Sequence, residues 1–450
     1  MNLSPGAVLS ESGAVFVTVS ILLIPLAMAG LALINSGLGR ARNATHMVMA
    51  SLCVVAVAAG IYFVCGFSFE GVIGGPAHTV SIGGKPWNWL GAQLLFFRGL
   101  DLNGSPASLA AWMQLFCVGL AALIPLGAAA ERWRLGAICT STAVLAGITY
   151  PLFAHWAWAG GWLAQLGVNY GLGHGFVDAG GSGVIQTVGG LAALSMAWIV
   201  GPRRGKYTQE GMPSAIPGHH GVFVIFGCWL AWIGWLGLNS AGAVLFSGLA
   251  PARTVLVGVN TTLGAGSAAL MTALVTRMRF GRPDASLTAN GWVAGLAAGS
   301  GGCAFVAPAA AVLTGLIAGL VVPFVIENLE LRLAIDDPGG AISVHAVGGI
   351  WGLVATGIFG RFPAVIVNNA DSLARTPPPG DSGQWVAQIV GVASLLGVVL
   401  PLTYGFNWVL NRWSPQRVSA EGERQGLDLH ELGAGAYPEF LTHGDEFLQH

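Results

Sequence analysis

Two polar side chains that could do chemistry stand in apolar stretches, each eight residues after an aspartate. Gln186 follows Asp178, and His345 follows Asp337. A histidine inside an apolar span is costly to bury, which favours a functional role over a structural contact with a neighbouring helix. A neutral imidazole donates and accepts hydrogen bonds at once and relays a proton near neutral pH. The amide of Gln186 can hydrogen-bond the imidazole, but it does not titrate.

These four residues belong to a stretch that occurs twice. Residues 178–190 align with residues 337–349, so that the aspartates, the Gly-Gly pairs and the Val-Gly-Gly runs coincide. Two half-chains built alike, each with a polar group at membrane depth, are typical of transporters and channels made of repeats. An aspartate before glycines also fits a helix N-cap. We interpret Asp337 as such a structural cap. For Asp178, a cap and the stabilisation of an arriving cation both stay open.

The composition restricts the class of protein. Of 450 residues, 9% are charged and 54% are hydrophobic, which excludes a soluble globular chain. The net charge of -1 gives no nucleic-acid footprint. The six cysteines lie in apolar segments without a C-x-x-C pair, so neither a disulfide framework nor a metal site is expected. No cofactor is predicted.

Eleven apolar stretches are long enough to cross a bilayer as helices. They lie near residues 12–35, 46–68, 110–130, 136–158, 179–200, 220–246, 253–276, 286–304, 308–326, 341–360 and 385–411. The long outer connections are 70–109 and 362–384. The predicted fold is an all-α polytopic membrane protein, with a transmembrane domain at 1–411 and a polar cytoplasmic tail at 412–450.

Loop charge orients these spans. Fourteen of the 19 Lys and Arg residues fall on one side, which places the C-terminus in the cytoplasm and the N-terminus outside. Five spans separate the two copies of the repeat, so the copies enter the membrane from opposite sides. We therefore predict an inverted 5+5 repeat, with halves at about 12–200 and 220–360 and one extra helix at 385–411. Such repeats place their site near the midplane, so Gln186 and His345 are expected to face each other there.

Aromatic residues gather near the predicted outer face. Trp158 ends the fourth span near Asp178, while Trp235 and Asn239 lie in the sixth span and are assigned to the pore. A tryptophan at a membrane boundary is usually an interface anchor, but beside a carboxylate it can hold a small cation through its ring face. We find neither a carbonyl ring nor a charged ring along the path. The pore suits a molecule that arrives as a cation and crosses neutral, or a proton-coupled solute.

The order of these motifs resembles the ammonium transporter (Amt/Mep/Rh) family over nearly the whole chain. The matching runs are Ser36 to Asn43, Ala130-Glu131-Arg132, Tyr150 to Trp158, Asp178 to Gly190, Gly201 to Gly205, Ala289 to Leu296, Gly302-Cys303-Ala304 and Asp337 to Gly349. The resemblance implies a homotrimer with one pore per subunit, an outer ammonium site, and ammonia plus proton passing two central histidines. It assigns the outer site to Trp158, Asp178 and Phe116, and the central pair to Gln186 and His345.

Four positions depart from the family pattern. Gln186 replaces the first central histidine, and Gly242 stands in place of an outer-site serine. Cys117 and Leu238 occupy the positions of the two gating phenylalanines in the predicted pore. The gate is therefore smaller, and the relay has one titratable member fewer. Both changes affect the expected proton coupling and ammonium selectivity.

The tail also resembles the family. Residues 423–428 and Ala436-Tyr437 match the cytoplasmic segment through which bacterial members couple subunits and meet PII signal proteins. The alternative is a solvated amphiphilic tail. The resemblance implies a transporter rather than an enzyme, in the lipid bilayer of a prokaryotic inner membrane, with ammonium or ammonia as substrate. Two other functions stay open: an ammonium sensor with impaired conduction that signals through its tail, and a channel for another small neutral molecule.

Overall fold

The computed structural model describes residues 9–362 and 383–437, so most of the predicted connection at 362–384 lies outside the described residues. The helices of the first half are α1 (Glu11–Leu38), α2 (Ala44–Ile61), α3 (Phe67–Glu70), α4 (Pro106–Ala128), α5 (Leu135–Val144), α6 (Tyr150–Ala157), α7 (Leu166–Tyr170) and α8 (Val188–Val200). Those that follow are α9 (Gly221–Leu245), α10 (Thr254–Phe280), α11 (Ala285–Ser300), α12 (Pro308–Leu333), α13 (Gly348–Phe359), α14 (Gln384–Ser394), α15 (Leu400–Trp413), α16 (Ala420–Gln425) and α17 (Leu427–Leu432).

Short π-helical stretches interrupt five of the membrane segments. They are η2 (Tyr62–Gly66), η3 (Leu145–Thr149), η4 (Ser182–Thr187), η6 (Ile342–Val347) and η7 (Leu395–Val399). Within the described residues, ten continuous helical segments are long and apolar enough to cross a membrane. With 16 residues, α11 is the eleventh and is shorter than predicted, because it ends at Ser300 before a turn that leads into α12. The predicted polytopic fold of eleven helices is confirmed.

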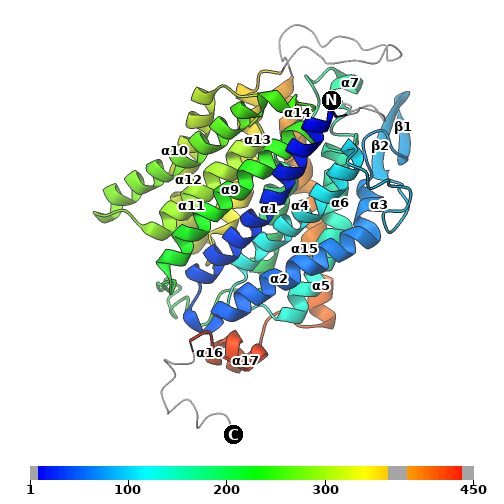
Figure 1. Ribbon diagram of the computed structural model, residues 1–450. Helices are drawn as coiled ribbons and strands as arrows, with labels where there is room; N and C mark the ends of the chain where they lie inside the picture. Colours follow the sequence, from blue (N-terminus) through cyan, green and yellow to red (C-terminus); the bar gives the residue numbers. More distant parts are fainter. Residues whose placement is uncertain (1–8, 363–382, 438–450) are drawn as a thin grey trace.

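The bundle has two distinct ends (Figure 1). A β-hairpin of β1 (Ala77–Ile82) and β2 (Lys85–Gly91) lies at one end, which we call the hairpin side. The tail helices α16 and α17 lie at the opposite end, the tail side. The hairpin is an addition to the predicted all-α class. It is anchored to the bundle because Trp156 Nε1 donates a 2.8 Å hydrogen bond to Trp89 O, and Trp162 N donates a 2.9 Å bond to Asn88 O.

The first helices of the two halves, α1 and α9, cross at small residues. A β-carbon at Gly30 would lie 2.5 Å from Gly227 O, and one at Gly234 would lie 2.1 Å from Ala27 N. No side chain fits at either glycine, so the two backbones are in direct contact. Small residues are the usual means of close helix packing in lipid.

The fifth segments of the two halves, η4–α8 and η6–α13, make a symmetric crossing. A β-carbon at Gly190 would lie 2.2 Å from Ala346 N, and one at Gly349 would lie 2.5 Å from Thr187 Oγ1. In the sequence repeat Gly190 corresponds to Gly349, and Thr187 corresponds to Ala346. The same contact is therefore made twice with the roles of the halves exchanged, as expected around a pseudo-twofold axis.

The crossing at Gly190 predicts a large effect from a single methyl group. Gly190→Ala places a β-carbon against backbone that cannot move aside, so we expect a loss of about 1–3 kcal/mol, typical of overpacking, and a lower Tm in detergent. Gly266→Ala is the matched control, because that glycine lies inside α10 with nothing within 4 Å of an added β-carbon. Equal melting temperatures for the two variants would contradict the crossing.

Candidate functional site

The carboxylate of Asp178 caps the start of η4. Its Oδ1 accepts a 3.0 Å hydrogen bond from Gly181 N, and its Oδ2 accepts bonds of 2.8 and 2.9 Å from Gly183 N and Val184 N. Gly181 has a φ of 93°, which turns the chain so that these N–H groups point at the carboxylate. Both oxygens are engaged in the cap, as expected for an acidic residue at a helix start.

Asp337 caps η6 in the same way. Its Oδ1 accepts a 2.9 Å bond from Ala341 N, and its Oδ2 accepts a 2.8 Å bond from Ile342 N. Gly340, with a φ of 67°, makes the matching turn. The two copies of the repeat thus have the same local architecture as well as the same sequence pattern.

The two π-helical stretches bring Gln186 and His345 into contact. His345 Nδ1 lies 2.7 Å from Gln186 Oε1, and both side chains are buried. A carbonyl oxygen only accepts, so Nδ1 carries the proton and donates, while Nε2 of the imidazole is left as an acceptor. Gln186 Nε2 is buried without a hydrogen-bond partner in the described chain. π-Helical turns often occur at functional sites, and here they carry the pair.

A cavity of about 610 Å³ opens on the hairpin side, and we call it the vestibule. Its wall includes a buried carboxylate, Glu70, which the sequence analysis missed. Tyr62 Oη donates a 2.7 Å bond to Glu70 Oε2, and Gln114 Nε2 donates to Oε1. Tyr150 Oη donates in turn to Gln114 Oε1 at 2.5 Å. The available signal was an acidic residue directly after an apolar span.

Trp158 also lines the vestibule, where it stacks face to face on Phe246 with ring centroids 4.1 Å apart. Its Nε1 donates a 2.6 Å bond to the backbone oxygen of Asp178. One face of the indole is therefore covered by Phe246. The predicted neighbour Phe116 is not among the vestibule residues and packs against Trp112, with ring centroids 6.2 Å apart.

The other predicted pore residues are buried between helices. Trp235 Nε1 donates to Ser300 Oγ at 3.1 Å, and Asn239 Nδ2 donates to Thr261 Oγ1 at 2.9 Å. At Gly242 the chain passes so close to Ala179 that a β-carbon would lie 2.5 Å from its carbonyl oxygen.

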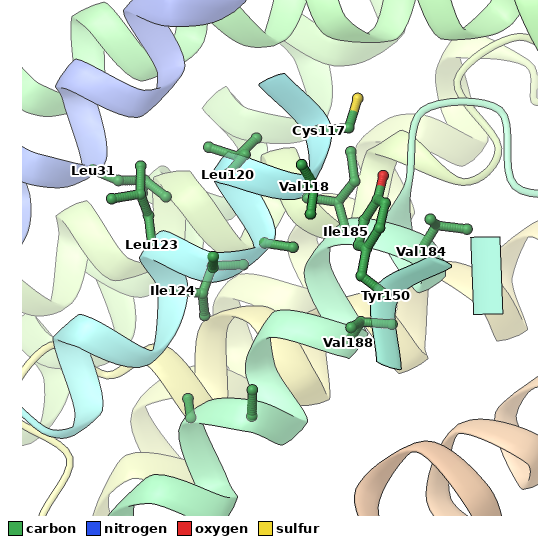
Figure 2. Close-up of a cluster of buried hydrophobic side chains, with 14 of the residues drawn as sticks. Leu31, Cys117, Val118, Leu120, Leu123, Ile124, Tyr150, Val184, Ile185 and Val188 are labelled. Carbon is green, nitrogen blue, oxygen red and sulfur yellow. The ribbon is translucent and has the colours of Figure 1, made fainter. Parts of the chain in front are cut away.

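Cys117 and Leu238, at the positions of the expected gate, are fully buried. Figure 2 shows Cys117 in a cluster of apolar side chains that includes Val118, Val184 and Ile185. Ile185 directly precedes Gln186, so this apolar cluster adjoins the central pair.

Buried ion pairs hold the loops of the tail side. Arg203 Nε and Nη2 bond the two carboxylate oxygens of Asp336 at 2.9 and 3.0 Å, and its Nη1 bonds Glu131 Oε1 at 3.0 Å. Arg132 Nη2 donates a 2.8 Å bond to Asp336 O. Burial opposes ionisation of Asp336, but the hydrogen bonds from Arg203 and the charges of both arginines outweigh it and lower its pKa.

The tail helix α17 docks onto the first half of the chain. Asp428 accepts bonds from Thr45 N at 3.1 Å and His46 N at 2.7 Å, at the start of α2. Glu431 Oε2 accepts a 2.9 Å bond from Leu135 N, at the start of α5, and lies 2.8 Å from His46 Nε2. Partial burial opposes ionisation of Glu431, but these two hydrogen bonds outweigh it and lower its pKa.

Comparisons with known proteins agree along nearly the full chain. Residues 15–437 match the model of the Ammonium Transporter Family. The chain is 33% identical over 422 residues to ammonium transporter Amt2 of Archaeoglobus fulgidus, covering 93% of this chain and 86% of that protein. It is 30% identical over 428 residues to the ammonium transporter of Bacillus subtilis, covering 95% and 98%.

Solved structures of similar fold agree with these relatives. One, described as a sensor Amt protein, has a TM-score of 0.80 at 28% identity, covering 93% of this chain and 97% of that one. Mep2 of Saccharomyces cerevisiae has a TM-score of 0.74 at 24% identity, covering 91% and 90%, and this likeness concerns the fold alone.

The cap at Asp178 predicts a loss of stability on removal of its charge. Asp178→Asn leaves one acceptor oxygen and turns an amide N–H₂ toward backbone N–H groups, so we expect a cost of about 1.5–3 kcal/mol. Thermal unfolding in detergent measures it. Asp101→Asn, in an exposed loop, is the control and should melt like the wild type. An unchanged Tm for Asp178→Asn would contradict the cap.

Proposed function

Because the chain belongs to the ammonium transporter family, we propose that it captures ammonium in the vestibule and passes ammonia through an apolar pore past Gln186 and His345. One observation carries the proposal. The Gln186–His345 hydrogen bond joins the two halves of the repeat, next to an apolar cluster and in line with a vestibule that contains a carboxylate. We assign no enzymatic activity.

Capture is attributed to Glu70 and Trp158. Each oxygen of the Glu70 carboxylate accepts one protein hydrogen bond and keeps a lone pair for an N–H of ammonium. A carboxylate in a cavity raises the local concentration of small cations. The stacked rings of Trp158 and Phe246 supply an aromatic wall beside it. Asp178 supports this site indirectly, since its backbone oxygen orients the indole of Trp158.

Deprotonation follows from the apolar cluster beyond the vestibule. Buried side chains such as Cys117, Val118 and Ile185 offer little to solvate a charge, so a cation pays a large desolvation cost there. Ammonium therefore gives up one proton to the water of the vestibule, and ammonia enters with its lone pair free.

The central pair suits neutral ammonia. The free N–H of Gln186 Nε2 can donate to the ammonia lone pair, and His345 Nε2 can accept an ammonia N–H. Ammonium has no lone pair and cannot accept from the amide. Because the amide does not titrate, the pair cannot hand a proton from one member to the other. We infer transport of ammonia without a proton relay through these two residues.

We further propose a homotrimer in a prokaryotic inner membrane, with the hairpin side and the N-terminus outside and the tail side in the cytoplasm. The excess of Lys and Arg in the loops on the side of the tail supports this orientation. The docked segment 420–432 supports the tail as the contact for a PII-type signal protein, because its acidic side chains connect it to α2 and α5.

A sensor that binds ammonium but conducts poorly is the second candidate. The observation that favours it is the buried apolar cluster around Cys117 and Leu238, together with a tail that contacts two membrane helices. A channel for another neutral molecule such as a small amine is the third.

Ammonia flux into proteoliposomes is the first test. An ammonium chloride pulse should alkalinise the interior, as read by a trapped pH dye in stopped flow, with a saturable rate. His345→Leu removes the acceptor of the central pair and should slow that rate at least about tenfold while leaving Tm unchanged. Binding of ammonium without flux in the wild type would favour the sensor. Flux of methylamine without flux of ammonia would favour another substrate.

The vestibule carboxylate predicts a change in apparent affinity. Glu70→Gln keeps the shape but removes the charge, so the ammonium concentration for half-maximal flux should rise about tenfold with little change in the maximal rate. Glu11→Gln is the matched control, because Glu11 lines the same cavity but is exposed at its rim. The same concentration dependence for all three proteins would remove Glu70 from the capture site.

A further inference from the structure

A second, much smaller cavity touches His345 from the tail side. Its volume is about 10 Å³, enough for one molecule of the size of water or ammonia. The apolar part of its wall includes Leu31 and Ile124, which Figure 2 shows on neighbouring helices. The polar part consists of His345, Asn35 and Asn290. No acidic residue lines the cavity, so it is not built for a cation.

The two asparagines lack protein partners. Asn35 and Asn290 are buried, with 9% and 6% of their surface exposed. In the described parts of the chain, neither side-chain amide makes a hydrogen bond to another residue. Buried amides are nearly always hydrogen-bonded, so these two call for a partner that is not part of the protein. Both amides line the cavity, which is the available place for that partner.

The repeat motif itself makes room for the asparagines. A β-carbon at Gly339 would lie 3.1 Å from Asn35 Oδ1, and one at Gly340 would lie 2.5 Å from Asn290 Nδ2. The Gly-Gly pair after Asp337 therefore does two things. It turns the chain into η6, and it lets amides from α1 and α11 approach the start of that helix.

We propose that this cavity is a second binding site, which holds one neutral ammonia molecule between His345 and the tail side. The inference rests on the proposed transport function and extends it. Ammonia offers three N–H donors and one lone pair, and the two amides offer both carbonyl acceptors and N–H donors. Asn35 and Asn290 take over the hydrogen bonds that ammonia gives up when it leaves His345 Nε2. They thereby reduce the cost of leaving the imidazole inside an apolar path.

The size of the cavity adds a consequence for specificity. A volume of about 10 Å³ leaves no room for an additional methyl group, so methylamine should be held poorly in this site. The asparagines then help to determine which neutral amine passes, in addition to whatever selection takes place in the vestibule.

The test compares three variants in the stopped-flow assay. Asn35→Leu keeps the volume and removes the amide, and it should slow ammonia flux about fivefold without changing half-saturation in the vestibule. Asn35→Ala enlarges the cavity and should raise methylamine flux relative to ammonia flux. Asn328→Leu, on the exposed face of α12, is the control and should match the wild type in both.

The possible failures are distinguishable. A wild type without ammonia flux would overturn the proposed function. Normal wild-type flux, together with unchanged flux in Asn35→Leu and an unchanged amine ratio in Asn35→Ala, would overturn the second site alone. Osmotic shrinkage provides the last arm. Slower water flux with unchanged ammonia flux in Asn35→Leu would mean that the cavity holds water, and it would overturn the assignment to ammonia.

Discussion

The close approach of two interrupted helices at Gly190 and Gly349 is the constraint on which the site depends. Each glycine lies against backbone or a short side chain of the other half, so no larger residue fits at the crossing. The contact brings Gln186 and His345 within 2.7 Å of each other, four residues before each glycine. A wider crossing would separate the amide from the imidazole and leave two unpaired polar groups in an apolar interior, at a cost that the rest of the bundle would have to offset.

The two halves share a scaffold but differ in chemistry at a single place. Asp178 and Asp337 make the same cap, and Gly181 and Gly340 make the same turn. At the next equivalent position one half has an amide and the other an imidazole. A symmetric backbone therefore presents an asymmetric pair, in which one partner keeps its charge state at every pH and the other can change it.

Reading the sequence alone reached the central contact because its determinants are local and repeated. Gln186 and His345 follow equivalent caps at equal spacing, and inverted entry of the two copies brings such residues together. The eleven spans followed from apolar length in the same way. Glu70 escaped attention because its importance arises from Tyr62 and Gln114, which are brought to it by packing. The stack of Trp158 on Phe246 and the hairpin likewise depend on contacts between distant segments, which neither spacing nor hydropathy reports.

The docked tail has a consequence for the biosynthesis of the chain. Asp428 bonds the start of α2 across 382 residues of sequence, and Glu431 bonds the start of α5 across 296. A ribosome completes α2 and α5 long before it adds α17. These two helix starts must therefore wait with unpaired N–H groups, satisfied by water, until translation is nearly finished. Docking of α17 marks the molecule as full length, and a truncated product leaves both helix starts open to solvent and to the cell's quality control.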